Sequence, residues 1–324
     1  MRFEIKNVKL DQIESEDETY RITTNDNTDD LVASIQRIGI INPPLLVQNI
    51  SNYKIVCGFR RISASRRLGW NNMDVRILDA NTKKLECVKY AIVDNAFQRS
   101  LNLIEISRSV NMLYGFLDER NHLGMEMAAM GLPENRSLIK KIKKICHLPM
   151  TLQNGILSNT LSLSMALELG SLEKETGKGF SKLFANLKLS LSKQREMLTL
   201  VKEIAHRDDA FMLEVLNDNA IQNILNNNHF DRNQKVSKIR RYLKQRRFPI
   251  ITKAEQTFET HVKRLNLKAG VQLIPPENFE STKYTLRFTF SSYDELQDHK
   301  STFDAVIKNP SIYSIFGIDK NNML

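Results

Sequence analysis

Two short stretches of this sequence carry side chains that could bind a phosphate group and a metal ion. In the first, the strand-forming run from Tyr53 to Cys57 ends at Gly58, and a helix that carries Arg60 and Arg61 follows. The free N–H groups and the dipole at a helix start favour an anion, and a guanidinium group can donate two hydrogen bonds to a phosphate. This pattern predicts an anion site. The alternative is that the arginines only cover a solvated helix face.

The second stretch is Asp94-Asn95, which follows a helical apolar pattern over residues 85–93. A carboxylate beside an amide suits Mg²⁺, a hard ion that prefers a few oxygen ligands together with phosphate oxygens. The alternative is that these short polar side chains cap the next helix. No second carboxylate near Asp94 is placed for two-metal chemistry, and no HEXXH motif or Cys–His nucleophile pair is found. These observations argue against a nuclease or a kinase-like enzyme.

A third stretch, residues 136–147, predicts a basic helix for which Asn135 is a good N-cap. Its apolar stripe is formed by Leu138, Ile142 and Ile145, joined by Ile139 and Cys146. Its basic residues are Arg136, Lys140, Lys141, Lys143 and Lys144. A short helix over 125–130 precedes it, and the two form a helix-turn-helix whose second helix can enter the major groove of DNA. The alternative is a solvated lysine face on an ordinary bundle helix.

The composition sets bounds on the class of protein. With 324 residues and 41% hydrophobic residues, the chain can form two or three globular domains. The formal charge of +10 and the pI near 9.4 indicate a polyanionic partner, with nucleic acid favoured over an acidic membrane surface. The three cysteines lack metal-binding spacing, and no signal peptide or long apolar run is found. We therefore expect a cytoplasmic protein with reduced cysteines and no membrane contact.

A small sheet and several helices are needed to position these side chains. The alternating first 13 residues predict a strand, and a helix over 31–39 ends at Gly39. Strands over 45–50 and 53–57 predict a hairpin around a turn at Ser51-Asn52, and residues 74–78 predict another strand. From residue 104 to about residue 219 the apolar pattern is helical.

The last third of the chain predicts a basic segment and a small terminal unit. Residues 235–247 carry seven basic side chains and no acidic one, which predicts either a solvated linker helix or a non-specific phosphate contact. The terminal unit has the order helix, strand, strand, helix, with Ser292 as the cap of the last helix. Such a unit is too small to bury both faces of its sheet, so we expect a second copy to cover it. The alternative is a monomeric subdomain that packs on its own chain.

Several of these motifs resemble those of the ParB family of partition proteins. The run Gly39-Ile-Ile-Asn-Pro-Pro-Leu-Leu-Val47 is similar to the family's GI-x-QP segment, and Gly58-Phe-Arg-Arg61 is similar to its GERR box. Residues 94–105 resemble the motif ENLQREDLNPLE. In that family these motifs hold the triphosphate of CTP. The resemblance implies Mg²⁺ ligands at Asp94 and Asn95, and CTP-binding residues Gly39, Asn42, Pro43, Gly58, Arg60, Arg61, Asp94, Asn95 and Arg99.

The basic helix and the terminal unit also resemble ParB proteins. The segment from Asn135 to Pro149 aligns without gaps with the family's SRSHVSNTLRLLKLP. This match implies DNA-binding residues Asn135, Arg136, Ser137, Lys140, Lys141 and Lys144, the last of them nearest a phosphate. The sequence YDEL at 293–296 resembles the start of the last helix in the family's C-terminal dimerisation domain.

The resemblance implies a multidomain α+β fold. We expect a small mixed-sheet ParB-like nucleotide-binding domain over 1–100, an all-α helix-turn-helix domain over 101–230, a basic linker over 231–250 and a small α/β dimerisation domain over 251–324. The implied function is a sequence-specific, centromere-binding partition protein. It would be a homodimer that forms a sliding clamp on double-stranded DNA, gated by CTP and Mg²⁺, and it would be associated with the nucleoid or a plasmid.

Two positions depart from the family pattern. Arg21-Ile22 lies where the family has a glutamine implicated in hydrolysis, and Phe59 replaces a glutamate. We therefore expect nucleotide binding and leave slow CTP hydrolysis open. The alternative function is a ParB-like transcriptional regulator or nucleoid-organising DNA binder without nucleotide switching. A ParA-type ATPase stays an open partner, because the basic N-terminal tail that many partition proteins use for it is missing or displaced.

Overall fold

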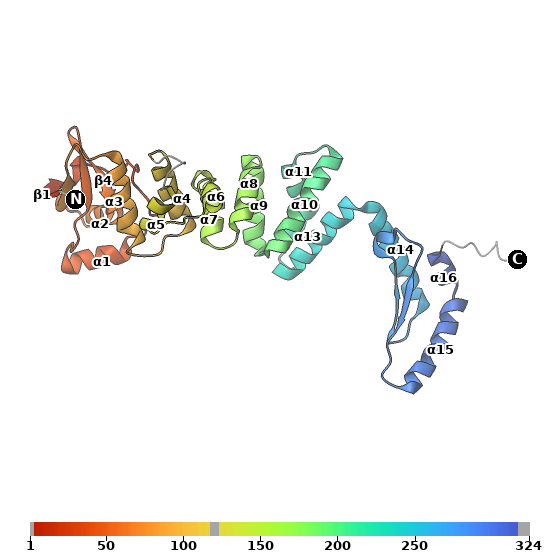
Figure 1. Cartoon of the computed structure of the whole chain (residues 1–324). Coiled ribbons are helices and arrows are strands. Elements are labelled where there is room, and N and C mark those ends of the chain that lie inside the picture. The colour runs from red at the N-terminus through yellow and green to blue at the C-terminus, as the bar shows by residue number, and fades with distance from the viewer. Residues whose placement is uncertain (1–2, 117–122, 317–324) are drawn as a thin grey trace. The chain divides into compact units, whose positions relative to one another are not determined.

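A computed structural model describes residues 3–116 and 123–316 of the chain, which is drawn in Figure 1. The chain divides into two compact units, Met1–Gln194 and Arg195–Leu324. The first contains a five-stranded sheet followed by helices, and the second contains helices and a two-stranded sheet. The predicted multidomain α+β fold class is confirmed. None of the described helices combines the length and the apolar character needed to cross a bilayer.

The sheet of the first unit is mixed, as predicted. Its strands lie in the order β1-β5-β3-β4-β2. β1 pairs antiparallel with β5 and β3 pairs antiparallel with β4, while the β3–β5 and β2–β4 pairs are parallel. The bounds are β1 Phe3–Lys9, β2 Ile13–Glu14, β3 Leu45–Asn49, β4 Asn52–Cys57 and β5 Asn72–Leu78.

The predicted hairpin of β3 and β4 is present, but the predicted turn is wrong by one residue. Asn49 pairs with Asn52, so the turn is formed by Ile50 and Ser51. Ile50 has a φ of 44° and its side chain is 96% exposed. A β-branched residue rarely adopts a positive φ, which explains why the sequence pattern did not indicate this turn. The first strand is also shorter than predicted, because a 3-10 turn at Leu10–Gln12 separates β1 from β2.

The two faces of the sheet bury different side chains because residues alternate along each strand. On one face, Leu46 and Ile55 pack with Ile62 of α2. On the other face, Leu45 and Val47 pack with residues of α3 and α4. α1 packs against α2. The bounds of these helices are α1 Asp29–Ile38, α2 Phe59–Arg67, α3 Lys84–Ala96 and α4 Leu103–Tyr114.

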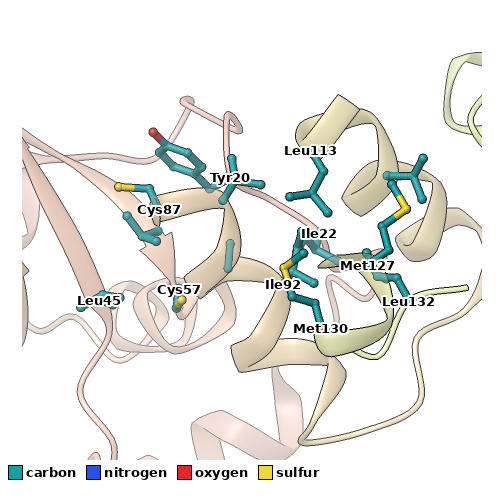
Figure 2. Close-up of a cluster of buried hydrophobic side chains, with 14 of the residues drawn as sticks. Tyr20, Ile22, Leu45, Cys57, Cys87, Ile92, Leu113, Met127, Met130 and Leu132 are labelled. Atoms are coloured by element: carbon teal, nitrogen blue, oxygen red, sulfur yellow. The ribbon is translucent and has the colours of Figure 1, made fainter. Parts of the chain in front are cut away.

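One hydrophobic cluster joins the sheet to the helix-turn-helix. Figure 2 shows this cluster, which runs from Tyr20 and Leu45 through Ile92 of α3 to Met127 and Leu132. The sheet, α3, α4 and the helix-turn-helix therefore share one core. The later helices of the first unit are α5 Leu123–Ala129, α6 Arg136–Ile142, α7 Met150–Leu157, α8 Leu163–Gly170 and α9 Lys174–Leu187.

The predicted single helix over 136–147 is wrong in length. α6 ends at Ile142, and a 3-10 turn at Ile145–His147 follows. The hydroxyl of Ser107 on α4 donates to the carbonyl of Ile142 at 2.6 Å and accepts from the N–H of Cys146 at 3.0 Å. These two backbone groups would bond each other in a continuous helix, so the inserted hydroxyl ends it. Leu138 was predicted in the apolar stripe but is 38% exposed, whereas Ile139 is buried, as predicted.

The second unit contains most of α10 and the elements that follow. Residues 217–218 separate α11 from α12. β6 and β7 pair antiparallel, and the order helix, strand, strand, helix is as predicted. The bounds are α10 Leu191–Asp208, α11 Met212–Leu216, α12 Asn219–Asn226, α13 Arg232–Arg247, α14 Pro249–Leu265, β6 Val271–Ile274, β7 Thr285–Phe288, α15 Tyr293–Lys308 and α16 Pro310–Ile315.

Candidate functional site

A cleft of about 380 Å³ lies between the start of α2, the end of α3 and the loop that precedes α1. It brings together seven of the nine residues predicted to bind a nucleotide, namely Asn42, Gly58, Arg60, Arg61, Asp94, Asn95 and Arg99. The predicted residues Gly39 and Pro43 are not part of its lining in the described structure. The lining that the sequence reasoning did not assign is Tyr20, Ile22, Thr23, Leu31, Val56, Cys57, Phe59 and Gln98. Of these, Ile22 and Phe59 carried a sequence signal, as part of the two departures from the family pattern.

The glycine at the start of α2 is required by geometry. Gly58 is the N-cap of α2 and has a φ of 97°, in the left-handed region that favours glycine. A Cβ atom added there would lie 2.9 Å from the Cβ of Pro44 and 3.2 Å from the Nε of Arg61. The close approach of Pro44 thus fixes where the free N–H groups of the first turn of α2 are placed. This confirms the predicted order of strand, glycine and helix start.

Both arginines of this turn are held by backbone carbonyl groups. Arg60 donates from Nε and Nη2 to the carbonyl of Asn27, at 3.1 and 2.6 Å. Arg61 donates from Nη1 to the carbonyl of Asn42, and its Nη2 lies 3.6 Å from the Oδ2 of Asp94. Burial lowers the pKa of Arg61, and the charge of Asp94 acts in the opposite direction. The arginines are therefore oriented before any ligand binds.

Asp94 and Asn95 lie in the last turn of α3 and do not cap the next helix. Asn102 is the N-cap of α4, in a capping box with Glu105, so the capping alternative is wrong. Asp94 accepts from Gln98 at 3.2 Å, and the amide nitrogen of Asn95 donates to the carbonyl of Ala91 at 2.8 Å. The described residues contain no cluster of three or more metal-binding side chains. One carboxylate and one amide oxygen still fit Mg²⁺ when phosphate oxygens and water complete its shell.

Arg99 is bound to a buried carboxylate that the sequence reasoning did not assign to the site. Its Nη1 and Nη2 donate to Glu105 at 2.7 and 2.8 Å, and the Glu105 side chain is 1% exposed. Burial acts to raise the pKa of Glu105, but hydrogen bonds from Arg99, Thr24 and Asn102 outweigh it and lower the pKa. The spacing of Asn102 and Glu105 is a capping-box signal that could have identified this carboxylate.

The two positions that depart from the ParB pattern contact each other. The guanidinium carbon of Arg21 lies 5.9 Å from the ring centroid of Phe59. Arg21 also forms ion pairs with Glu18 and Asp26. Phe59 and Arg60 separate the cleft from a second one of about 330 Å³ that contains Arg21. The apolar ring of Phe59 therefore lines the cleft, whereas the paired Arg21 lines only the second one.

The helix-turn-helix presents a basic surface. The six predicted DNA-binding residues are all exposed, and the opposite side of this segment buries Ile139, Ile142 and Ile145. Asn135 is the N-cap of α6, as predicted, and accepts from the N–H of Leu138 at 3.0 Å. Within the described ranges none of the predicted lysines forms an ion pair. We call these six residues the α6 surface: Asn135, Arg136, Ser137, Lys140, Lys141 and Lys144.

The basic segment of the second unit is a packed helix. α13 buries Val236, Ile239 and Leu243, and its basic side chains face acidic residues of α10 and the start of α12. The ion pairs join Arg240 and Lys244 to Glu196, Arg246 to Asp208 and Asp218, and Arg247 to Glu203. Much of the positive charge of α13 is therefore neutralised within the second unit. The predicted contact of this segment with DNA stays a prediction.

Comparison with known proteins agrees with this geometry. Residues 2–96 match the ParB N-terminal domain family. The chain is 23% identical over 189 residues to a probable chromosome-partitioning protein ParB of Helicobacter pylori, covering 58% of the chain and 63% of that protein. It is 27% identical over 154 residues to a nucleoid occlusion protein of Halalkalibacterium halodurans, covering 48% and 52%. The matched part of the chain thus covers less than two thirds of the length of each of these two relatives.

Solved structures of ParB proteins are also similar to parts of the chain. A C-terminally truncated ParB of Caulobacter crescentus complexed with CTP-γ-S is 22% identical, covering 56% of this chain and 99% of that one, with a TM-score of 0.26. The same protein complexed to the centromeric parS site is 20% identical, covering 58% and 96%, with a TM-score of 0.33. The ParB resemblance inferred from the motifs is confirmed by the family match and the curated relatives.

Proposed function

We propose that this protein is a DNA-binding partition protein of the ParB type whose N-terminal cleft binds CTP with Mg²⁺. The observation that carries the proposal is one cleft that contains the start of α2 with Arg60 and Arg61 and the end of α3 with Asp94 and Asn95. The N–H groups of the first turn of α2 and the two guanidinium groups bind the phosphates. Asp94 and Asn95 hold the Mg²⁺ ion, which neutralises phosphate charge when it is bound.

DNA binding is assigned to the α6 surface. Its exposed side chains include bidentate donors for bases and a lysine for a phosphate, and its position after the turn suits insertion into the major groove. The curated relatives, which are named chromosome-partitioning and nucleoid occlusion proteins, support DNA as the partner. A cytoplasmic, nucleoid- or plasmid-associated location follows from this function. A ParA-type ATPase stays a candidate partner with no contact site assigned.

The homodimer is assigned to the C-terminal unit over 251–324. On α15, Leu296, Phe303 and Ile307 are between 41% and 48% exposed, while His299 and Val306 are buried on the side that packs on this unit. Their spacing places the exposed apolar residues on one helix face. A second copy that covers this face would bring two clefts and two α6 surfaces onto one DNA molecule, as a clamp requires.

The test is a calorimetric titration of the full chain with each of the four ribonucleoside triphosphates in the presence of Mg²⁺. We expect selective binding of CTP, and Arg61→Gln should weaken it by about tenfold or more, since a charge-assisted pair of hydrogen bonds is lost. The matched control is Arg37→Gln, an exposed arginine of α1 outside the cleft, which should bind as the wild type does. Thermal unfolding without nucleotide checks that both variants are folded.

A second function is favoured by the internal contacts of the arginines. Arg60 and Arg61 already donate to the carbonyls of Asn27 and Asn42, and Arg61 lies beside Asp94. A cleft whose cations are satisfied internally suits a ParB-like regulator or nucleoid organiser that binds DNA without a nucleotide. Absence of binding by all four nucleotides, with and without DNA, would contradict the nucleotide proposal and support this second function.

A further inference from the structure

A single buried carboxylate links the wall of the cleft to the helix that carries the α6 surface. Glu105 lies in the first turn of α4 and accepts five hydrogen bonds from three segments of the chain. Two come from the backbone and hydroxyl of Thr24, two from Arg99 and one from the N–H of Asn102. These hydrogen bonds hold the three segments in place. If a donor is lost, the buried carboxylate is left partly unsatisfied, and the desolvation of its charge is no longer compensated.

The cleft side of this connection consists of groups next to the expected ligand. Arg99 and Thr23 line the cleft, and Thr24 follows Thr23 directly. Arg108, one turn after Glu105 on α4, donates to the carbonyls of Thr23 at 2.7 Å and Ile22 at 3.3 Å. The first two turns of α4 therefore hold both Arg99 and the loop that forms one wall of the cleft.

The other side of α4 holds the end of α6. Ser107 is inserted between the carbonyl of Ile142 and the N–H of Cys146, and Asn111 donates to the carbonyl of Lys143 at 2.7 Å. Ser107 lies two residues after Glu105, which places their side chains on nearly opposite sides of the helix. One rigid helix thus contacts the cleft with one face and the end of α6 with the other.

We propose that Glu105 is the positioning residue through which the state of the cleft reaches the α6 surface. The proposal rests on the proposed binding of a nucleotide. A triphosphate in the cleft competes with Glu105 for the guanidinium group of Arg99. When Arg99 turns toward the phosphates, the carboxylate loses two of its five donors, and the first turn of α4 shifts to restore them. Because α4 is rigid, the hydroxyl of Ser107 then moves against the end of α6.

Hydrogen–deuterium exchange of the full chain, with and without CTP and Mg²⁺, tests this connection. In the wild type we expect the nucleotide to change exchange both at residues 58–61, which bind it, and at residues 142–147, which contact Ser107. Glu105→Gln keeps the side-chain length and removes the charge, so exchange at 58–61 should still respond while the response at 142–147 is lost. The control Glu175→Gln removes an exposed ion pair with Lys178 on α9 and should behave as the wild type does.

The outcomes separate this inference from the proposed function. A wild type in which residues 58–61 do not respond would overturn nucleotide binding itself. A wild type in which 58–61 respond and 142–147 do not, or a Glu105→Gln variant in which both respond, would overturn the role of Glu105 alone. If Glu105→Gln does not fold, Ser107→Ala provides the test from the far end of the path. That variant leaves the cleft intact and should lose only the response at 142–147, and an unchanged response there would overturn the inference.

Discussion

The helices α6 and α13 have similar basic compositions and opposite surroundings. On α6 the predicted DNA-binding lysines are exposed, and none of them pairs with an acid in the described ranges of the chain. On α13, four of the seven basic residues between 235 and 247 form ion pairs with acidic side chains of the same unit. The same sequence signal, a helix rich in lysine and arginine, thus corresponds to two different electrostatic situations.

The difference arises from residues that are distant in the sequence. The acids that bind Arg240, Arg246 and Arg247 lie 28 to 44 residues away along the chain. They cancel much of the field of α13 at the distance of a DNA backbone, whereas the uncompensated charges of α6 project into solvent. A basic helix therefore indicates a nucleic-acid surface only when its charges lack internal partners.

The largest expected effect comes from removing the charges of α6. Lys140→Ala combined with Lys141→Ala should weaken binding of duplex DNA by roughly thirtyfold or more, since two contacts are lost and each base contact is worth about 1–3 kcal/mol. Fluorescence anisotropy with a labelled duplex at fixed salt measures this. The midpoint of thermal unfolding should stay near that of the wild type, because both side chains are exposed.

Removing two basic side chains from α13 in the same way tests whether α6 and α13 differ in DNA binding. Lys238→Ala combined with Arg241→Ala removes two exposed charges from α13 and leaves its four ion-paired basic residues in place. We expect little change in DNA affinity. A loss as large as that of the α6 variant would mean that α13 also contacts phosphates, and the comparison of the two helices would be wrong.

A smaller effect is expected on stability when an ion pair of α13 is removed. Arg240 donates to Glu196 from Nε at 2.9 Å and from Nη2 at 2.7 Å. Arg240→Ala should lower the free energy of unfolding of the second unit by about 0.5–1 kcal/mol, a value kept small by the partial exposure of both side chains. Its DNA affinity should equal that of the wild type. Urea unfolding followed by circular dichroism measures the loss.

The neighbouring residue Arg241 provides the control for this change. It is exposed, and within the described part of the chain it has no acidic partner. Arg241→Ala should therefore leave the urea midpoint unchanged. Equal losses for Arg240→Ala and Arg241→Ala would show that the ion pair with Glu196 contributes nothing beyond helix propensity.

The parts of the site that could be predicted from the sequence depend only on residue type and on neighbours in the chain. Gly58 follows a strand and precedes a helix, and its positive φ and its contact with Pro44 are local requirements of that turn. The arginines after it and the carboxylate at Asp94 carry charge that can be recognised from residue type. These positions lie in one cleft, as expected, because β4, α2 and α3 pack on one sheet.

The parts that the sequence did not predict depend on distant partners. The role of Glu105 follows from its bond with Thr24, 81 residues away, and the end of α6 follows from Ser107, about 35 residues away. Neither contact leaves a periodic pattern in the sequence. The turn at Ile50 was missed for a different reason, because it uses a residue type that disfavours its backbone conformation.

The smallest expected effect is on the pH dependence of stability. It tests the comparison of α6 with α13 through Glu196, the acidic partner of Arg240 and Lys244. Burial acts to raise the pKa of Glu196, but Arg240 and Lys244 outweigh it and hold the pKa below its ordinary value of 4.5. A carboxyl whose pKa is lower in the folded state stabilises the fold fully above its unfolded pKa and loses this contribution as the pH falls through the folded pKa.

The second unit should therefore lose stability below about pH 4.5 more steeply in the wild type than in Glu196→Gln. Urea midpoints at a series of pH values measure the two slopes, and the difference should stay within about 1 kcal/mol because the carboxylate is partly solvated. The lysines of α6 have no acidic partner in the described ranges, so Lys140→Ala should leave the acid slope as it is in the wild type. Parallel slopes for the wild type and Glu196→Gln would mean that solvent screens the α13 pairs, and α13 would then be as available to phosphates as α6.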